Sequence, residues 1–117
     1  MTINGIEFTV EIAKTENEKT TGLMFREHLD QTAGMIFVYE KDKKMSFYMK
    51  NTLIPLSIAF LNAEGKIMQI EDMEPLNLET VNSRGAVRYA LEVNKGTFEK
   101  YGITEGDRVI FPEGFPY

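Results

Sequence analysis

The sequence of 117 residues contains no cysteine, and this absence removes several kinds of chemistry at once. Structural disulfides, thiolate nucleophiles and cysteine-ligated zinc are all excluded. Histidine is almost as scarce, because His28 is the single one and lies between Glu27 and Leu29 in a charged segment. No nucleophile or orienting partner is spaced around it as a catalytic histidine requires. We therefore interpret His28 as a surface residue.

Long apolar runs and an excess of positive charge are also lacking. No window approaches the roughly 20 apolar residues of a membrane span, and residues 1–5 lack the basic start and apolar stretch of a signal peptide. We expect a soluble, cytoplasmic protein, although a trimmed export signal replaced by a new Met would look the same. The net charge of -5 disfavours a nucleic-acid surface, which needs clustered Lys and Arg. We therefore predict neither membrane nor nucleic-acid partners.

The composition that remains is that of an ordinary folded domain. Hydrophobic residues make up 43% of the chain and charged residues 26%, which argues against disorder. A chain of this length has room for one hydrophobic core and not for two. The prediction is a single domain over residues 1–117.

Residues 46–61 join two apolar segments across one short polar interruption. Residues 53–61 contain only Ser57 as a polar residue, which favours a strand buried on both faces. Residues 46–50 alternate with the two-residue period of a strand that has one drier and one wetter side. Between them, Lys50-Asn51-Thr52 places three hydrogen-bonding side chains inside a core-forming segment. This interruption is the predicted location of a site.

The other segments favour short strands and two short helices. Asn4-Gly5 is a strong hairpin signal before an alternating run. Residues 15–18 fit a capping box that starts a helix reaching about Met24, and a second helix is predicted over Thr97–Tyr101. We expect about eight strands and no long crossover helix. The predicted fold is therefore mostly β, an antiparallel β-sandwich or a partly closed jelly-roll-like barrel with two short helices.

Several motifs in this order resemble a known family, the uncharacterised prokaryotic domain of unknown function 192. The motifs that carry the resemblance are Gly22-Leu23-Met24-Phe25-Arg26, Gly34-Met35-Ile36-Phe37, residues 47–56, residues 89–94 and Gly102-Ile103-x-x-Gly106-Asp107. The resemblance implies a compact β-sandwich or jelly-roll-like domain and supplies no established activity. Members commonly have tryptophan at the position of Tyr48, and a hydroxyl can both donate and accept where an indole only donates.

Polar residues inside otherwise apolar motifs define the candidate site. They are Arg26, Tyr48, Lys50, Asn51, Glu92 and Asn94. In the functional interpretation, Lys50 and Arg26 donate hydrogen bonds to a polar ligand, Glu92 accepts them, and Tyr48 forms a flat wall. In the structural interpretation, the same charges form an ion pair that fixes strand register.

The function predicted first is a non-enzymatic binding module for a small polar ligand, with carbohydrate as one candidate class. Its pocket lies around Lys50, Asn51, Glu92 and the loop of residues 74–86. The alternative is a protein-interaction module whose polar cluster is purely structural and whose partner contacts an edge strand or the aromatic tail. A hydrolase is the third hypothesis, with Glu92 and Asp72 as its carboxylate pair.

No catalytic residue, metal or cofactor is assigned from the sequence. Glu71 and Asp72 are adjacent in a predicted strand, so their side chains face opposite ways and form no ready-made clamp for a cation. We interpret these carboxylates, and Asp107, as solvated. Ser83 lacks the glycine context of a nucleophile elbow and is interpreted as a turn residue.

Overall fold

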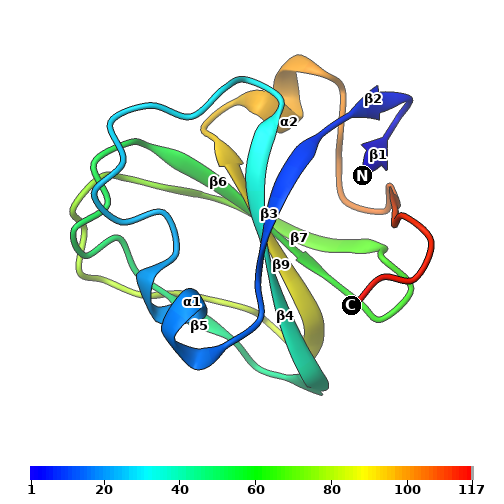
Figure 1. Ribbon diagram of the computed structural model, residues 1–117, viewed down its shortest axis with the longest axis horizontal. Helices are drawn as coiled ribbons and strands as arrows, with labels where there is room; N and C mark the ends of the chain where they lie inside the picture. Colours follow the sequence, from blue (N-terminus) through cyan, green and yellow to red (C-terminus); the bar gives the residue numbers. More distant parts are fainter. Residues whose placement is uncertain (117) are drawn as a thin grey trace.

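A five-stranded sheet forms the centre of the structure, a computed structural model that describes residues 1–116 (Figure 1). Its central strand, β9 (Val87–Asn94), lies between β4 (Ala33–Lys43) and β6 (Leu56–Leu61), and the edges are β3 (Thr9–Ala13) and β7 (Ile67–Met73). Strands account for 42% of the chain and helices for 9%. The prediction of a mostly β fold with two short helices is confirmed, and the sheets do not close into a barrel.

One pair of neighbouring strands in this sheet is parallel. Strand β3 runs parallel to β4, with Thr9 opposite Ala33, whereas β4–β9, β9–β6 and β6–β7 are antiparallel. A parallel pair needs a crossover of a dozen or more residues, and residues 14–32 supply it. The helix in this crossover, α1 (Glu16–Thr21), is too short to reveal the connection in the sequence.

A small three-stranded sheet and a short helix cover one face of the central sheet. Strand β1 (Thr2–Ile3) pairs with β2 (Ile6–Glu7) and with β10 (Val109–Ile110), and α2 (Thr97–Lys100) lies beside them (Figure 1). Both turn residues between β1 and β2 have positive φ, 51° at Asn4 and 77° at Gly5, as the hairpin signal predicts. The core beneath includes Ile3, Phe8, Ile36, Val38, Leu61, Leu91, Val93 and Val109.

Helix α1, the connecting segments and a two-stranded ribbon cover the opposite face. The ribbon pairs β5 (Ser46–Phe47) with β8 (Val81–Asn82), and Ser46 Oγ donates to Asn82 Oδ1 at 2.6 Å. The segment of residues 74–86, predicted to be a loop, therefore contains a short strand. The core under this layer includes Leu23, Met35, Phe37, Met49, Leu56, Ile58, Phe60 and Met73.

Both helices are short, and none in the part of the chain that the structure describes has the length and apolar character to cross a membrane. The predicted capping box at α1 is present, because Glu18 N donates to Thr15 Oγ1 at 3.1 Å and Thr15 N donates to Glu18 Oε1 at 2.9 Å. The helix ends at Thr21 and not at about Met24. Gly22 is the reason, since its φ of +48° leaves the helical region.

Apolar and polar residues alternate over residues 87–94, which predicts one dry and one polar face, but β9 is buried on both faces. The layers packed on the two sides of the central sheet cover both faces of this strand. Glu92 in this strand lies opposite Met35 of β4 and Ile58 of β6. Cross-strand partners share a face of the sheet, so Glu92 has apolar neighbours on both sides.

The close approach of β4 to β9 at Gly34 gives a test of the fold. A Cβ atom at Gly34 would lie 2.4 Å from the carbonyl oxygen of Glu92, whereas a Cβ at Gly85 would meet no atom within 4 Å. We expect Gly34→Ala to lower the free energy of unfolding by about 1–3 kcal/mol. We expect the control Gly85→Ala to change it by less than about 0.5 kcal/mol, with both values measured by urea unfolding. Equal stability of the two variants would contradict this pairing.

Candidate functional site

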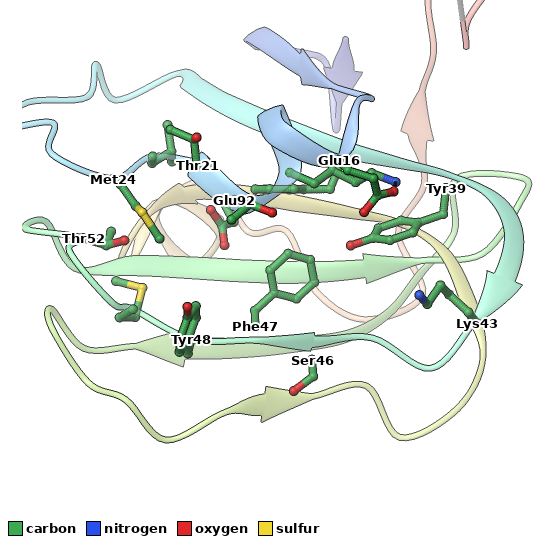
Figure 2. A pocket seen from close by; sticks show the side chains of 16 residues that line it. Glu16, Thr21, Met24, Tyr39, Lys43, Ser46, Phe47, Tyr48, Thr52 and Glu92 are labelled. Carbon is green, nitrogen blue, oxygen red and sulfur yellow. Dashed lines mark ion pairs between the residues drawn. The ribbon is translucent and has the colours of Figure 1, made fainter.

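A cavity of about 310 Å³ lies between the central sheet and the layer formed by α1, β5 and residues 48–52. Figure 2 shows the side chains that line it. They come from α1, the segment that follows it, strands β4, β5 and β9, and the turn after β5. The cavity thus collects side chains from segments far apart in the sequence, around the middle of the central strand.

Glu92 supplies the one acidic group of the central sheet that lines this cavity. The residue is 5% exposed, and no hydrogen bond or ion pair within residues 1–116 reaches its carboxyl group. Every fully enclosed side-chain nitrogen or oxygen in this part of the chain has a hydrogen-bond partner. The Glu92 oxygens must therefore keep a small contact with the cavity. The carboxyl oxygens of Glu92 can therefore form hydrogen bonds with a molecule in the cavity.

Burial controls the protonation of this carboxyl group. Loss of solvent disfavours the charged form, and it raises the pKa of Glu92 from 4.5 to about 8. At neutral pH the side chain is consequently a neutral carboxylic acid for most of the time. In this form it has one O–H donor as well as acceptor capacity.

Four aromatic rings, Phe37, Tyr39, Phe47 and Tyr48, form much of the remaining wall. Phe37 and Phe47 meet edge to face, with ring centroids 5.0 Å apart. The hydroxyl of Tyr39 points into the cavity (Figure 2), and no hydrogen bond to it is present among the described residues. Burial raises the pKa of Tyr39, and the negative charges of Glu16 and Glu92 raise it further.

The basic groups of the cavity gather around the Tyr39 ring. Lys19 Nζ lies 4.0 Å from the ring centroid and 3.4 Å from Glu16 Oε1, and Lys43 Nζ lies 5.3 Å from the same centroid. In Figure 2, Tyr39 and Lys43 lie on one side of Phe47, and Glu92 lies on the other. The two ends of the cavity therefore differ in charge.

The structure brings two of the predicted site residues, Tyr48 and Glu92, into this cavity. Lys50 is not among the lining residues. It is exposed in a turn, and its side chain makes no hydrogen bond or ion pair within residues 1–116. Asn51 acts through its backbone, since its φ is +55° and its carbonyl oxygen accepts a hydrogen bond from Phe25 N at 2.8 Å. The expected contact between Lys50 and Glu92 does not form.

The other two predicted residues have partners of their own. Arg26 forms a two-pronged ion pair with Glu11 of β3, and this hydrogen bonding lowers the pKa of Glu11. Asn94 donates its side-chain amide to the backbone carbonyls of Leu29 and Asp30. Arg26 and Asn94 thus anchor the segment between α1 and β4, and neither joins Glu92. Both side chains are bonded to other segments of the protein, and neither lines the cavity.

The sequence interpretation missed Lys19, Tyr39 and Phe47. The capping box places Glu16 and Lys19 three residues apart in the first helix, where they share a face. Tyr39 ends the buried run that starts at Gly34, and it is the only residue of that run with a hydroxyl. The sequence shows both features, but it does not indicate that α1 lies over β4.

The structure does not bring together the two carboxylates of the hydrolase hypothesis, Glu92 and Asp72. Asp72 is opposite Ser57 and accepts a hydrogen bond from its hydroxyl at 2.9 Å, and Ser57 is opposite Val93. Asp72 therefore lies on the Val93 face of the sheet, whereas the adjacent residue Glu92 lies on the other. No group of three acidic or histidine residues suited to a metal ion occurs within residues 1–116. His28 is exposed, and its Nε2 lies 2.8 Å from Asp30 Oδ1.

Three loops beside the cavity form a wall with exposed apolar side chains. Phe25 N donates to Asn51 O at 2.8 Å, and Leu76 N donates to Thr52 O at 3.0 Å. Phe25 and Leu76 have φ of 67° and 63°, which bulky residues rarely adopt. Phe25 is 66% exposed, and the nearby Leu78 is 67% exposed. The backbone is thus held in an unusual conformation that presents apolar groups to solvent.

Taken together, the fold and the cavity define a mostly β domain with a buried carboxyl group facing an aromatic-lined pocket. Residues 1–111 match the family model DUF192, described as Uncharacterized ACR, and the chain belongs to this family. No curated protein matches the chain.

Two crystal structures are similar to the chain. A protein from Sinorhizobium meliloti 1021, described as a "putative transcription regulator", is 35% identical, with a TM-score of 0.85 over 86% of this chain and 79% of that one. A protein of unknown function from Novosphingobium aromaticivorans DSM 12444 is also 35% identical. Its TM-score is 0.85, and the match covers 89% of this chain and 75% of that one.

The raised pKa of Glu92 has a measurable effect on stability. Between about pH 4.5 and pH 8 the native state keeps a proton on Glu92 that the unfolded chain releases, so the contribution of Glu92 to stability falls as the pH rises. We expect the free energy of unfolding of Glu92→Gln to rise relative to that of the unmodified protein by about 1 kcal/mol per pH unit in this window. Urea unfolding at a series of pH values measures the difference. A constant difference from pH 5 to pH 8 would show that the native carboxyl titrates normally.

Proposed function

We propose that this protein is a non-enzymatic binding module for a small polar ligand, held in the cavity at Glu92. One observation carries the proposal: Glu92 is 5% exposed, and its carboxyl group lines the cavity without a hydrogen bond or ion pair to any of residues 1–116. A buried polar group without a hydrogen bond costs folding free energy. Such a cost is understandable where a ligand supplies the missing bonds.

The size and lining of the cavity support this proposal. Its volume of about 310 Å³ falls at the lower end of the range for small-molecule sites, about 300–1,000 Å³. Apolar rings with a few convergent polar groups are the usual lining of such sites. Hydroxyl-rich ligands such as carbohydrates are one class that fits, because the flat ring of Tyr48 can stack on a sugar while Glu92 and Thr52 hydrogen-bond to it.

The description of the Sinorhizobium meliloti protein as a "putative transcription regulator" does not lead us to propose nucleic-acid binding for this chain. The net charge is -5, and besides Lys19, which pairs with Glu16, four further arginines or lysines pair with carboxylates. These pairs are Arg26–Glu11, Arg84–Glu105, Arg88–Asp42 and Lys95–Glu74. Phosphate binding would require unpaired basic groups gathered on one surface.

A melting-temperature screen tests the proposal. We expect at least one compound from a set of monosaccharides, phosphates, divalent cations and small organic amines to stabilise the protein. At one hundred times its dissociation constant, such a compound adds about 2.7 kcal/mol to the free energy of unfolding. Tyr48→Ala should reduce the shift because Tyr48 lines the cavity. Lys50→Met is the matched control, since Lys50 is exposed in the neighbouring turn and should leave the shift unchanged.

A second candidate function is a protein-interaction module. The observation that favours it is the exposed apolar wall, with Phe25 and Leu76 held at positive φ, because strained backbone concentrates at functional surfaces. The aromatic tail is less suited to this role than the sequence suggested. Phe111 and Phe115 stack on each other and pack against Tyr89, so they contribute to the domain's own core.

Sedimentation equilibrium separates the two functions. If the apolar wall binds a second copy of the chain, we expect association that depends on concentration and that Leu78→Ser weakens. A monomer at all concentrations, together with a ligand that stabilises the protein through the cavity, would favour the binding module.

A further inference from the structure

The two ends of the cavity differ in a way that indicates the chemistry of its ligand. Lys19 and Lys43 both lie over the ring of Tyr39, at one end. The labelled polar side chains near Glu92, at the other end, are the uncharged Thr21 and Thr52 (Figure 2). Among the labelled residues at this end of the cavity, which include Tyr48, Glu92 has the one carboxyl group (Figure 2).

We propose that the ligand carries an organic ammonium ion, which lies between the carboxyl group of Glu92 and the rings of Phe47 and Tyr48. This inference rests on the proposed binding function and names the class of ligand. Three features of the cavity carry it: the carboxyl group without a partner among residues 1–116, the aromatic rings that line the same cavity, and the position of both lysines at the Tyr39 end.

The aromatic wall is suited to a positive charge. The face of an aromatic ring attracts cations through its quadrupole, and groups of such rings recognise alkylated ammonium ions. The cavity already contains an example, because the ammonium group of Lys19 lies 4.0 Å from the centroid of Tyr39. The rings of Phe47 and Tyr48 have no lysine at such a distance within residues 1–116. Phe47 packs against Phe37 and Phe60 and also lines the cavity, and the ring of Tyr48 is 43% exposed.

Other titratable groups line the same cavity as Glu92. Helix α1 contributes Glu16 and Lys19, strand β4 contributes Tyr39 and Lys43, and Tyr48 follows β5. Glu16 and Lys19 form an ion pair with each other. The chain as a whole is acidic, with a net charge of -5, which favours the approach of a cation over that of an anion.

Binding of an ammonium ion in this position is coupled to release of a proton. The neutral acid of Glu92 gives its proton to the solvent, and the carboxylate that remains pairs with the cation. No other bond forms or breaks. Since the pKa of Glu92 is about 8, the carboxyl group is about nine-tenths protonated at pH 7. A cation should therefore release about 0.9 proton on binding at this pH, whereas a neutral ligand should release none.

Isothermal titration calorimetry with choline, tetramethylammonium and methylammonium tests the proposal. The matched control for choline is 3,3-dimethyl-1-butanol, which has the same shape without the charge. We expect at least one of the three cations to bind, and the neutral alcohol to bind at least tenfold more weakly. Titrations at pH 7 in two buffers with different heats of ionisation count the protons released. The affinity for the cation should rise about tenfold per pH unit below pH 7 and level off above about pH 9.

Two variants connect these results to the cavity. Glu92→Gln keeps the shape of the side chain but has no proton to release, so it should lose the proton release and weaken cation binding at least tenfold. Tyr48→Ala changes an exposed ring and does not threaten the core. It should weaken binding of the cation more than binding of the neutral alcohol. Lys50→Met should behave like the unmodified protein in every titration.

The outcomes separate this inference from the function on which it rests. If none of the cations binds while a sugar or another neutral compound stabilises the protein through Tyr48, the binding module stands and the ammonium proposal is wrong. Cation binding that is unchanged in Glu92→Gln, or that releases no proton at pH 7, would also overturn it. If no compound of any class binds, the proposed function itself fails.

Discussion

The structure depends on one unusual constraint, a carboxyl group placed on the middle strand of the central sheet. Strand β9 is buried on both faces, and Met35 and Ile58 flank Glu92 on the neighbouring strands. A charge at such a position is costly without a partner, and the group can avoid the cost by keeping its proton. The cavity beside Glu92 has an aromatic wall and lysines at one end, and Glu92 gives it a buried hydrogen-bonding group.

The layer over this face of the sheet contains several residues with positive φ around the cavity. Gly22 ends α1 directly above the ring of Phe37, where a side chain would come within 3.4 Å of the ring. Backbone hydrogen bonds connect the three loops at the rim through Phe25, Asn51 and Leu76, all at positive φ. Strained backbone of this kind persists only where the surrounding structure determines it strongly. The rim is thus a fixed part of the site, and its exposed apolar groups border the cavity.

Much of the fold could be predicted from the sequence because local chemistry determines it. The hairpin at Asn4-Gly5, the capping box at Thr15 and the mostly β class all follow from short-range patterns. The site was only partly predictable. Tyr48 and Glu92 were identified as polar residues within apolar motifs, but Lys50 lies in an exposed turn and Arg26 pairs with Glu11. Pairing between charges depends on the path of the crossover from β3 to β4, which no local pattern reveals.

The most direct test of this account is the titration of the Glu92 side chain itself. Carbon-13 NMR of the glutamate carboxyl groups, with the Glu92 signal assigned by its loss in Glu92→Gln, follows its protonation without any ligand. The account predicts a midpoint near pH 8, because burial without a partner raises the pKa of this group. A midpoint near the ordinary value of 4.5 would contradict it, since the carboxyl group would then be charged and solvated at neutral pH.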